Sequence, residues 1–88
     1  MEVIYKNKAI EDIKLWKKSG QKTTQARISK LIQDIQTHPA KGLGKPEQLK
    51  YELTGLWSRE IDKANRLIYE VIGNNIHVIS MRGHYFDK

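Results

Sequence analysis

The sequence predicts an α+β fold in which an antiparallel sheet carries an N-terminal helical hairpin on one face. Two amphipathic stretches occupy the first half of the chain, and strand-like alternation fills most of the second half. A short strand-like segment, 2–6, precedes both helices. The predicted order is therefore β-α-α-β-β-β-β, a two-layer arrangement in which the helices bury one side of the sheet.

Strand signals are strongest between Leu56 and Tyr85, where three runs are rich in Ile, Val, Tyr and Trp. These runs are 56–61, 66–72 and 76–82. Asp, Asn and Gly between the runs favour tight turns, so the sequence predicts a three-stranded meander. Before the meander, residues 48–53 alternate apolar and polar side chains and are predicted as a further strand.

The first predicted helix ends at Gly20, and the second runs from Lys22 to Thr37. Gly often follows the last turn of a helix, and Pro39 cannot continue the second one. Apolar residues repeat at helical spacing in both helices. They are Ile10, Ile13 and Trp16 in the first, and Ile28, Leu31, Ile32 and Ile35 in the second. The short connection between them predicts an antiparallel hairpin.

Length and composition predict one domain, 1–88, with a modest core. The sequence has no Cys, which excludes disulfides, thiolate nucleophiles and Cys-ligated zinc. No pair of His has metal-ligand spacing, so we expect neither a metal site nor a cofactor. No apolar run reaches the length of a membrane span and no signal peptide opens the sequence, which favours a cytoplasmic protein without membrane association.

The net charge of +6 is concentrated in the first half of the chain. Residues 1–44 carry nine Lys or Arg against four Asp or Glu, whereas residues 45–88 carry seven against six. Such a distribution favours a polyanionic partner, of which nucleic acid is the commonest. Lys residues that are simply solvated on helix faces would account for the same charge.

Three residues are candidates for a catalytic site: Glu47, Arg66 and His84. If the last two strands turn at 73–75, the numbers of paired residues sum to about 148, which places Arg66 near His84. A slip of one residue would reverse the faces, so the register decides whether the two side chains converge. Each residue also has a simpler interpretation, respectively as a solvated carboxylate, a salt-bridging Arg and an exposed His.

Four segments carry a resemblance to a known protein family. They are GKPEQLK at 44–50, LTGLWSR at 53–59, NRLIY at 65–69 and GHY at 83–85. In this order, and with the two amphipathic helices before them, they resemble the YoeB/Txe toxins. These toxins belong to the RelE/ParE superfamily of type II toxin–antitoxin systems.

The resemblance implies a microbial ribonuclease-like fold and a ribosome-dependent mRNA endoribonuclease that acts in the A site. It makes Glu47 the general base, Arg66 the group that stabilises the phosphate, and His84 the general acid. Further positions match residues that bind or orient RNA. They are Lys50, Arg59 and Tyr85.

These residue types suit RNA cleavage by the substrate's own 2′-hydroxyl, which needs no metal. A carboxylate can remove the 2′-OH proton, and a His can protonate the leaving 5′-oxygen at neutral pH. The Arg fork meets two phosphate oxygens and keeps its charge. Tyr85 could stack on a base.

The resemblance also implies partners. We expect a cognate acidic antitoxin of the YefM/Phd type that covers the sheet, a homodimer, and operator DNA binding by the toxin–antitoxin complex. Two positions depart from the family pattern: Glu60 stands where Arg is common, and Asn65 where His is usual. Glu60 adds a negative charge near the expected phosphate path.

Two other hypotheses fit the same residues. One is a toxin of this superfamily without nuclease activity, such as the gyrase-inhibiting type. The other is an RNA-binding or antitoxin-binding module in which Glu60 has abolished catalysis. An intact message in the presence of damaged chromosomal DNA would favour the former, and a Glu60→Arg variant that gains cleavage would favour the latter.

Overall fold

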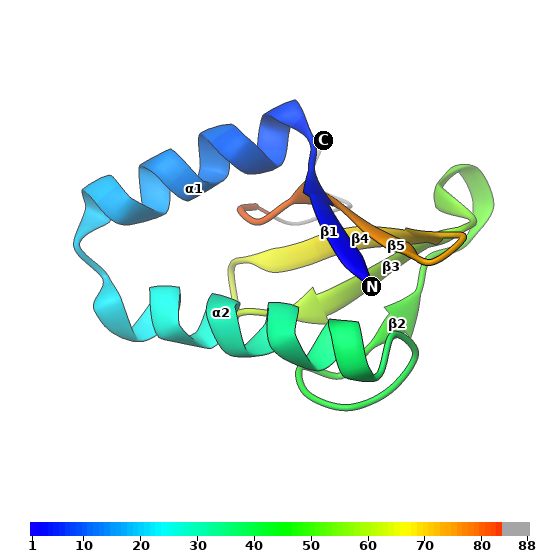
Figure 1. Ribbon diagram of the computed structural model, residues 1–88. Coiled ribbons are helices and arrows are strands. Elements are labelled where there is room, and N and C mark those ends of the chain that lie inside the picture. The colour runs from blue at the N-terminus through cyan, green and yellow to red at the C-terminus, as the bar shows by residue number, and fades with distance from the viewer. Residues whose placement is uncertain (84–88) are drawn as a thin grey trace.

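The computed structural model describes residues 1–83 and places two helices against a five-stranded sheet (Figure 1). The predicted α+β fold class is confirmed. His84 and Tyr85 lie outside the described residues. The elements are β1 (Glu2–Tyr5), α1 (Asn7–Ser19), α2 (Lys22–Thr37), β2 (Glu47–Gln48), a 3-10 turn (Tyr51–Leu53), β3 (Leu56–Glu60), β4 (Arg66–Ile72) and β5 (Asn75–Ser80).

The sheet is mixed, with the strand order β1-β5-β4-β3-β2. The prediction of a purely antiparallel sheet is wrong at one edge, because β1 runs parallel to β5 with Val3 opposite Ile76. No turn joins these two strands, so no local signal in the sequence determines their relative direction. The meander of β3, β4 and β5 is antiparallel, as predicted.

The strand predicted at 48–53 is much shorter in the structure. Only Glu47–Gln48 pairs with β3, and a 3-10 turn follows at Tyr51–Leu53. Tyr51 has a φ of 59°, a left-handed backbone that takes the chain out of the extended conformation. The Tyr51 carbonyl accepts hydrogen bonds from the Thr54 amide (3.1 Å) and hydroxyl (2.6 Å), which holds this turn.

The core lies between the helices and one face of the sheet. Buried side chains of β4 and β5, such as Leu67 and Val78, pack with Leu31 and Ile35 of α2. The stripe predicted on α1 is partly wrong, because Ile10 is 42% exposed. Trp16 is buried as predicted, and the other buried positions of α1 are Ala9 and Asp12.

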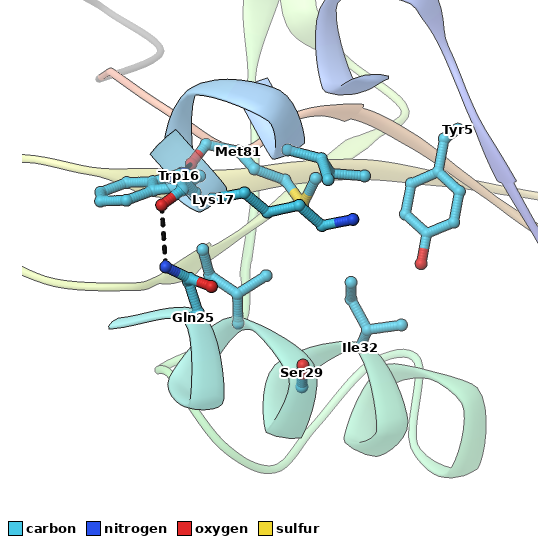
Figure 2. Close-up of a pocket in the computed structure, with 9 residues that line it drawn as sticks. Tyr5, Trp16, Lys17, Gln25, Ser29, Ile32 and Met81 are labelled. Atoms are coloured by element: carbon cyan, nitrogen blue, oxygen red, sulfur yellow. Dashed lines mark hydrogen bonds between the residues drawn. The ribbon is translucent and has the colours of Figure 1, made fainter. Parts of the chain in front are cut away.

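A hollow of about 200 Å³ lies between α1 and α2 (Figure 2). Tyr5, Trp16, Ile28 and Met81 are among its lining residues, and the Gln25 side-chain amide crosses between the helices to the Trp16 carbonyl at 2.8 Å. None of the predicted site residues lines it. Within residues 1–83, neither helix combines the length and the apolar character that crossing a bilayer requires.

Candidate functional site

Glu47, Ser58 and Arg66 lie on the same face of the sheet, across the three neighbouring strands β2, β3 and β4. Glu47 is directly opposite Ser58, and Arg66 is directly opposite Glu60, two residues after Ser58. Side chains directly opposite each other share a face, as do residues two apart on one strand. This face is the one turned away from the helices, because the alternate residues Leu67 and Tyr69 belong to the core.

Ser58 lies next to both predicted catalytic residues, opposite Glu47 on the neighbouring strand and in contact with the Arg66 side chain. It is fully buried, and the Arg66 Nε–H donates to its hydroxyl at 2.9 Å. This hydrogen bond at Nε fixes the orientation of the Arg66 guanidinium. Sequence reasoning missed this role. The only available signal was the position of Ser58 in the WSR segment.

The end of the last strand is bonded directly to Arg66. The Arg66 amide donates to the Gly83 carbonyl at 2.9 Å, and the Asn65 Oδ1 accepts from the Gly83 amide at 2.9 Å. The expected proximity of Arg66 to the residues before His84 is therefore confirmed as far as Gly83. Asn65, a departure from the family pattern, also donates to Asp62 at 3.0 Å and so ties this end to the β3–β4 turn.

Met81 is held from the helical layer by two side chains one helical turn apart. The Asp12 carboxylate accepts from the Met81 amide at 2.8 Å, and the Trp16 indole donates to the Met81 carbonyl at 2.8 Å. Asp12 is only 1% exposed and is paired with Lys8 at 2.6 Å. The Arg82 guanidinium lies 5.8 Å from the Trp16 ring centroid. Together these contacts fix the backbone at the end of β5, two residues before Gly83.

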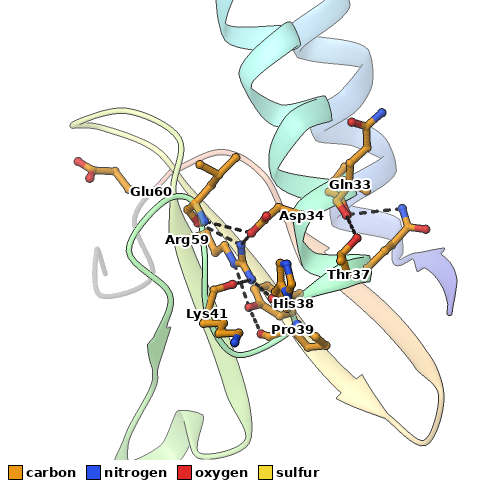
Figure 3. Close-up of polar contacts among 12 residues, drawn as sticks. Gln33, Asp34, Thr37, His38, Pro39, Lys41, Arg59 and Glu60 are labelled. Atoms are coloured by element: carbon orange, nitrogen blue, oxygen red, sulfur yellow. Dashed lines mark hydrogen bonds and ion pairs between the residues drawn. The ribbon is translucent and has the colours of Figure 1, made fainter.

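Arg59 does not lie where an RNA-binding residue is expected. It is 0% exposed, and it faces the helices, opposite to its neighbour Ser58. All five of its N–H groups are used: one by the Tyr69 hydroxyl, one by Asp34 and three by backbone carbonyls (Figure 3). The Arg59 guanidinium therefore has neither an exposed surface nor a spare N–H group with which to bind a phosphate.

The remaining predicted residues differ in what the structure says of them. Lys50 is exposed and directly precedes the 3-10 turn, on the same edge of the sheet as Glu47. The Glu60 carboxylate lies 3.9 Å from the Lys45 ammonium, so its added charge is partly offset within the protein. His84 and Tyr85 lie outside the described residues. Among residues 1–83, no group of three or more acidic or His side chains could hold a metal ion.

The described residues combine two of the groups that cleavage of a phosphodiester uses. They offer an exposed carboxylate at Glu47 and a guanidinium at Arg66 aligned by Ser58. A carboxylate and a guanidinium on one face supply a proton acceptor and a fixed positive charge, which suits a reaction that forms negative charge on phosphate. The chain's net charge of +6 favours an anionic substrate.

The protein-family model described as "YoeB-like toxin of bacterial type II toxin-antitoxin system" matches residues 5–85 of this sequence. The chain belongs to the YoeB toxin family. It is 41% identical to toxin YoeB of Streptomyces coelicolor over 97% of this chain and 100% of that protein. It is 34% identical to toxin YoeB of Escherichia coli K12 over the same shares. The chain is therefore a toxin of the type II toxin–antitoxin class.

Solved YoeB structures have the same fold. A YoeB/ParE toxin from Agrobacterium tumefaciens superposes with a TM-score of 0.92 at 33% identity, covering 97% of this chain and 100% of that one. The YoeB dimer from Staphylococcus aureus superposes with a TM-score of 0.85 at 36% identity, covering 97% and 98%. A YoeB–YefM complex from the same organism matches equally well.

Proposed function

We propose that this YoeB-family toxin is an mRNA endoribonuclease that acts on the ribosome. The observation that carries the proposal is the placement of Glu47 and Arg66 on the face of the sheet turned away from the helices. Ser58 lies opposite Glu47 in the ladder and is hydrogen-bonded to Arg66. Gly83, which precedes His84 in the chain, is hydrogen-bonded to the Arg66 backbone. Membership of the YoeB family and the motif residues support the same activity.

In the proposed reaction, the Glu47 carboxylate accepts the proton of the 2′-hydroxyl. The 2′-oxygen attacks the adjacent phosphorus, the bond from phosphorus to the 5′-oxygen breaks, and His84 donates a proton to that oxygen. The products are a 2′,3′-cyclic phosphate and a free 5′-hydroxyl. Arg66 stabilises the negative charge that builds up on the two non-bridging oxygens. Lys50 binds the RNA backbone and Tyr85 stacks on a base.

A His84→Gln variant tests the acid. We expect the rate of message cleavage during translation to fall about 10²-fold, because Gln cannot donate a proton to the leaving oxygen. Primer extension on a reporter message measures the rate and locates the cut. The matched control is His77→Gln, since the His77 Nδ1 has no hydrogen-bond partner within residues 1–83.

Two outcomes would contradict this assignment. Equal cleavage by the wild type and His84→Gln would remove His84 from the reaction. An intact message together with broken chromosomal DNA would instead favour the gyrase-inhibiting function known in this superfamily.

We further propose that the toxin forms a homodimer and binds an acidic antitoxin. The Staphylococcus aureus relatives were solved as a YoeB dimer and as a YoeB–YefM complex, and this chain carries a net charge of +6. If charge attraction contributes to binding, the dissociation constant should rise steadily as salt increases from about 0.05 to about 0.5 M. Titration calorimetry measures the constant, and light scattering gives the mass of the free toxin. An affinity that does not change with salt would contradict the electrostatic part.

A further inference from the structure

β3 supports the proposed site on both of its faces. Ser58 lies on the face turned away from the helices and aligns Arg66. The next residue, Arg59, points to the helices and bonds to a loop. This loop, 38–44, links the end of α2 to the segment that carries Glu47. Because neighbouring residues of a strand face opposite sides, one short stretch of β3 can contact both catalytic regions.

The loop is held by its carbonyl oxygens rather than by its side chains. The Arg59 guanidinium donates to the carbonyls of His38, Lys41 (2.9 Å) and Leu43 (3.1 Å). The carbonyl of Pro39 accepts a hydrogen bond of 2.6 Å from the Tyr69 hydroxyl. Four carbonyls of one loop therefore converge on two buried side chains of the sheet (Figure 3).

Asp34 completes this buried cluster from the helical side. Its carboxylate receives the Arg59 guanidinium at 2.5 Å and the Leu43 amide at 3.0 Å. A Cβ on Gly42 would lie 2.1 Å from that carboxylate, so the loop can approach Asp34 this closely only with Gly here. Gly42 also has a φ of 112°, a conformation that other residues rarely adopt.

From this anchored loop the chain passes directly to Glu47. The Gly44 carbonyl accepts a hydrogen bond of 2.7 Å from the Glu60 amide of β3. Only Lys45 and Pro46 separate this bond from Glu47, which is itself paired with Ser58. The two-residue strand β2 has little pairing of its own, so the path of the preceding loop determines where Glu47 lies.

We propose that Arg59, Tyr69 and Asp34 are positioning residues that hold Glu47 at the distance from Arg66 which RNA cleavage requires. This inference rests on the proposed function, because it explains how the general base is placed. It assigns Arg59 a role in the geometry of the site rather than in RNA contact. The charge of Arg59 is fully satisfied inside the protein, which is what a buried guanidinium requires.

A Tyr69→Phe variant tests the proposal without removing a charge from the cluster. Removal of Arg59 would leave the Asp34 carboxylate without its counter-ion and could unfold the protein. The variant keeps the ring, which stacks on Trp57 at 6.4 Å, and deletes only the hydroxyl between Arg59 and the Pro39 carbonyl. We expect message cleavage to fall about tenfold, since a displacement of about 1 Å in a catalytic group can cost hundredfold. Tyr5→Phe is the matched control, a half-buried Tyr on β1 outside this cluster.

Two further measurements separate positioning from a general loss of structure. In a Glu47→Gln background, Tyr69→Phe should cause no additional loss of cleavage, because its effect passes through Glu47. Hydrogen exchange should accelerate at the amides of Leu43 and Glu60, which bond to Asp34 and Gly44, while core amides such as that of Val78 stay protected.

The possible outcomes are distinguishable. The positioning role would be overturned if Tyr69→Phe cleaved the message at the wild-type rate. It would also be overturned if Tyr69→Phe lowered the rate by the same factor in Glu47→Gln as in the wild type. Either result would leave the nuclease function standing. If the wild-type toxin itself leaves the message intact, the proposed function fails. Hydrogen exchange then still tests whether Arg59, Tyr69 and Asp34 hold the loop. If exchange at Leu43 and Glu60 is the same in Tyr69→Phe as in the wild type, these side chains do not hold it.

Discussion

A Glu47→Gln variant is expected to cleave mRNA about 10²–10⁴-fold more slowly than the wild-type toxin while keeping its stability. The amide has almost the same shape as the carboxylate but cannot take the proton of the 2′-hydroxyl. Glu47 is exposed and Gln has nearly its size, so we expect the free energy of unfolding to change little. Single-turnover cleavage on ribosomes that carry a defined message measures the chemical step.

Glu52→Gln is the matched control for this experiment. Glu52 is also exposed and lies in the 3-10 turn after β2, so it loses the same charge at the same edge of the sheet. We expect its cleavage rate to stay close to that of the wild type. If the two variants lost activity equally, the effect would come from the total charge, and Glu47 would not be the base.

An Asp34→Ala variant is expected to lose about 3 kcal/mol of its free energy of unfolding. The substitution leaves Arg59 buried without its counter-ion, and breaking such a pair is strongly destabilising. We place the loss at the lower end of the usual range because the Asp34 side chain is 19% exposed and Arg59 keeps its carbonyl partners. Urea denaturation followed by circular dichroism measures the change. This amount is a large share of the stability of a small domain.

The pH dependence of this loss gives a second test. The hydrogen bond from Arg59 holds the pKa of the Asp34 carboxyl below its ordinary value of 3.8, although burial opposes this shift. A carboxyl whose pKa is lower in the folded state stabilises the fold above its ordinary pKa, and this stabilisation disappears as the pH falls through the folded-state pKa. The difference between the wild type and Asp34→Ala should therefore be constant near neutral pH and shrink below about pH 4.

Gln33→Ala provides the control on the same helix. Gln33 is exposed, and we expect its replacement to change the free energy of unfolding by no more than about 0.5 kcal/mol. If Asp34→Ala unfolded at the same urea concentration as this control, the backbone carbonyls alone would be sufficient to compensate the Arg59 charge.

The parts of the fold that could be predicted from the sequence are those with local signals. β4 was predicted at its observed bounds, because alternation and turn residues mark both of its ends. The pairing of β1 with β5 joins the two ends of the chain and has no local signal. The segment 48–53 alternates like a strand, but the left-handed backbone at Tyr51 converts most of it to a turn.

The candidate site was predictable in its residue types but not in its supports. The expectation that the numbers of paired residues in the last two strands sum to about 148 correctly placed Arg66 near the end of the last strand. It did so although an irregularity between Ile68 and Tyr69 shifts the register within β4. Arg59 was expected to contact RNA, because its position matches a residue that binds or orients RNA in the family. Its burial depends on Asp34, far away in the chain, and on loop carbonyls whose direction no side chain reveals.

The pairing of β1 with β5 also determines when the toxin can form during its synthesis. β1 is synthesised well before its partner residues, such as Ile76 and Val78. A sheet closed by contacts so distant in sequence forms slowly, since the long loop must be ordered before the contacts stabilise it. The nascent chain therefore cannot have a finished sheet before residues 75–80 have been synthesised, so the fold becomes complete only after that point.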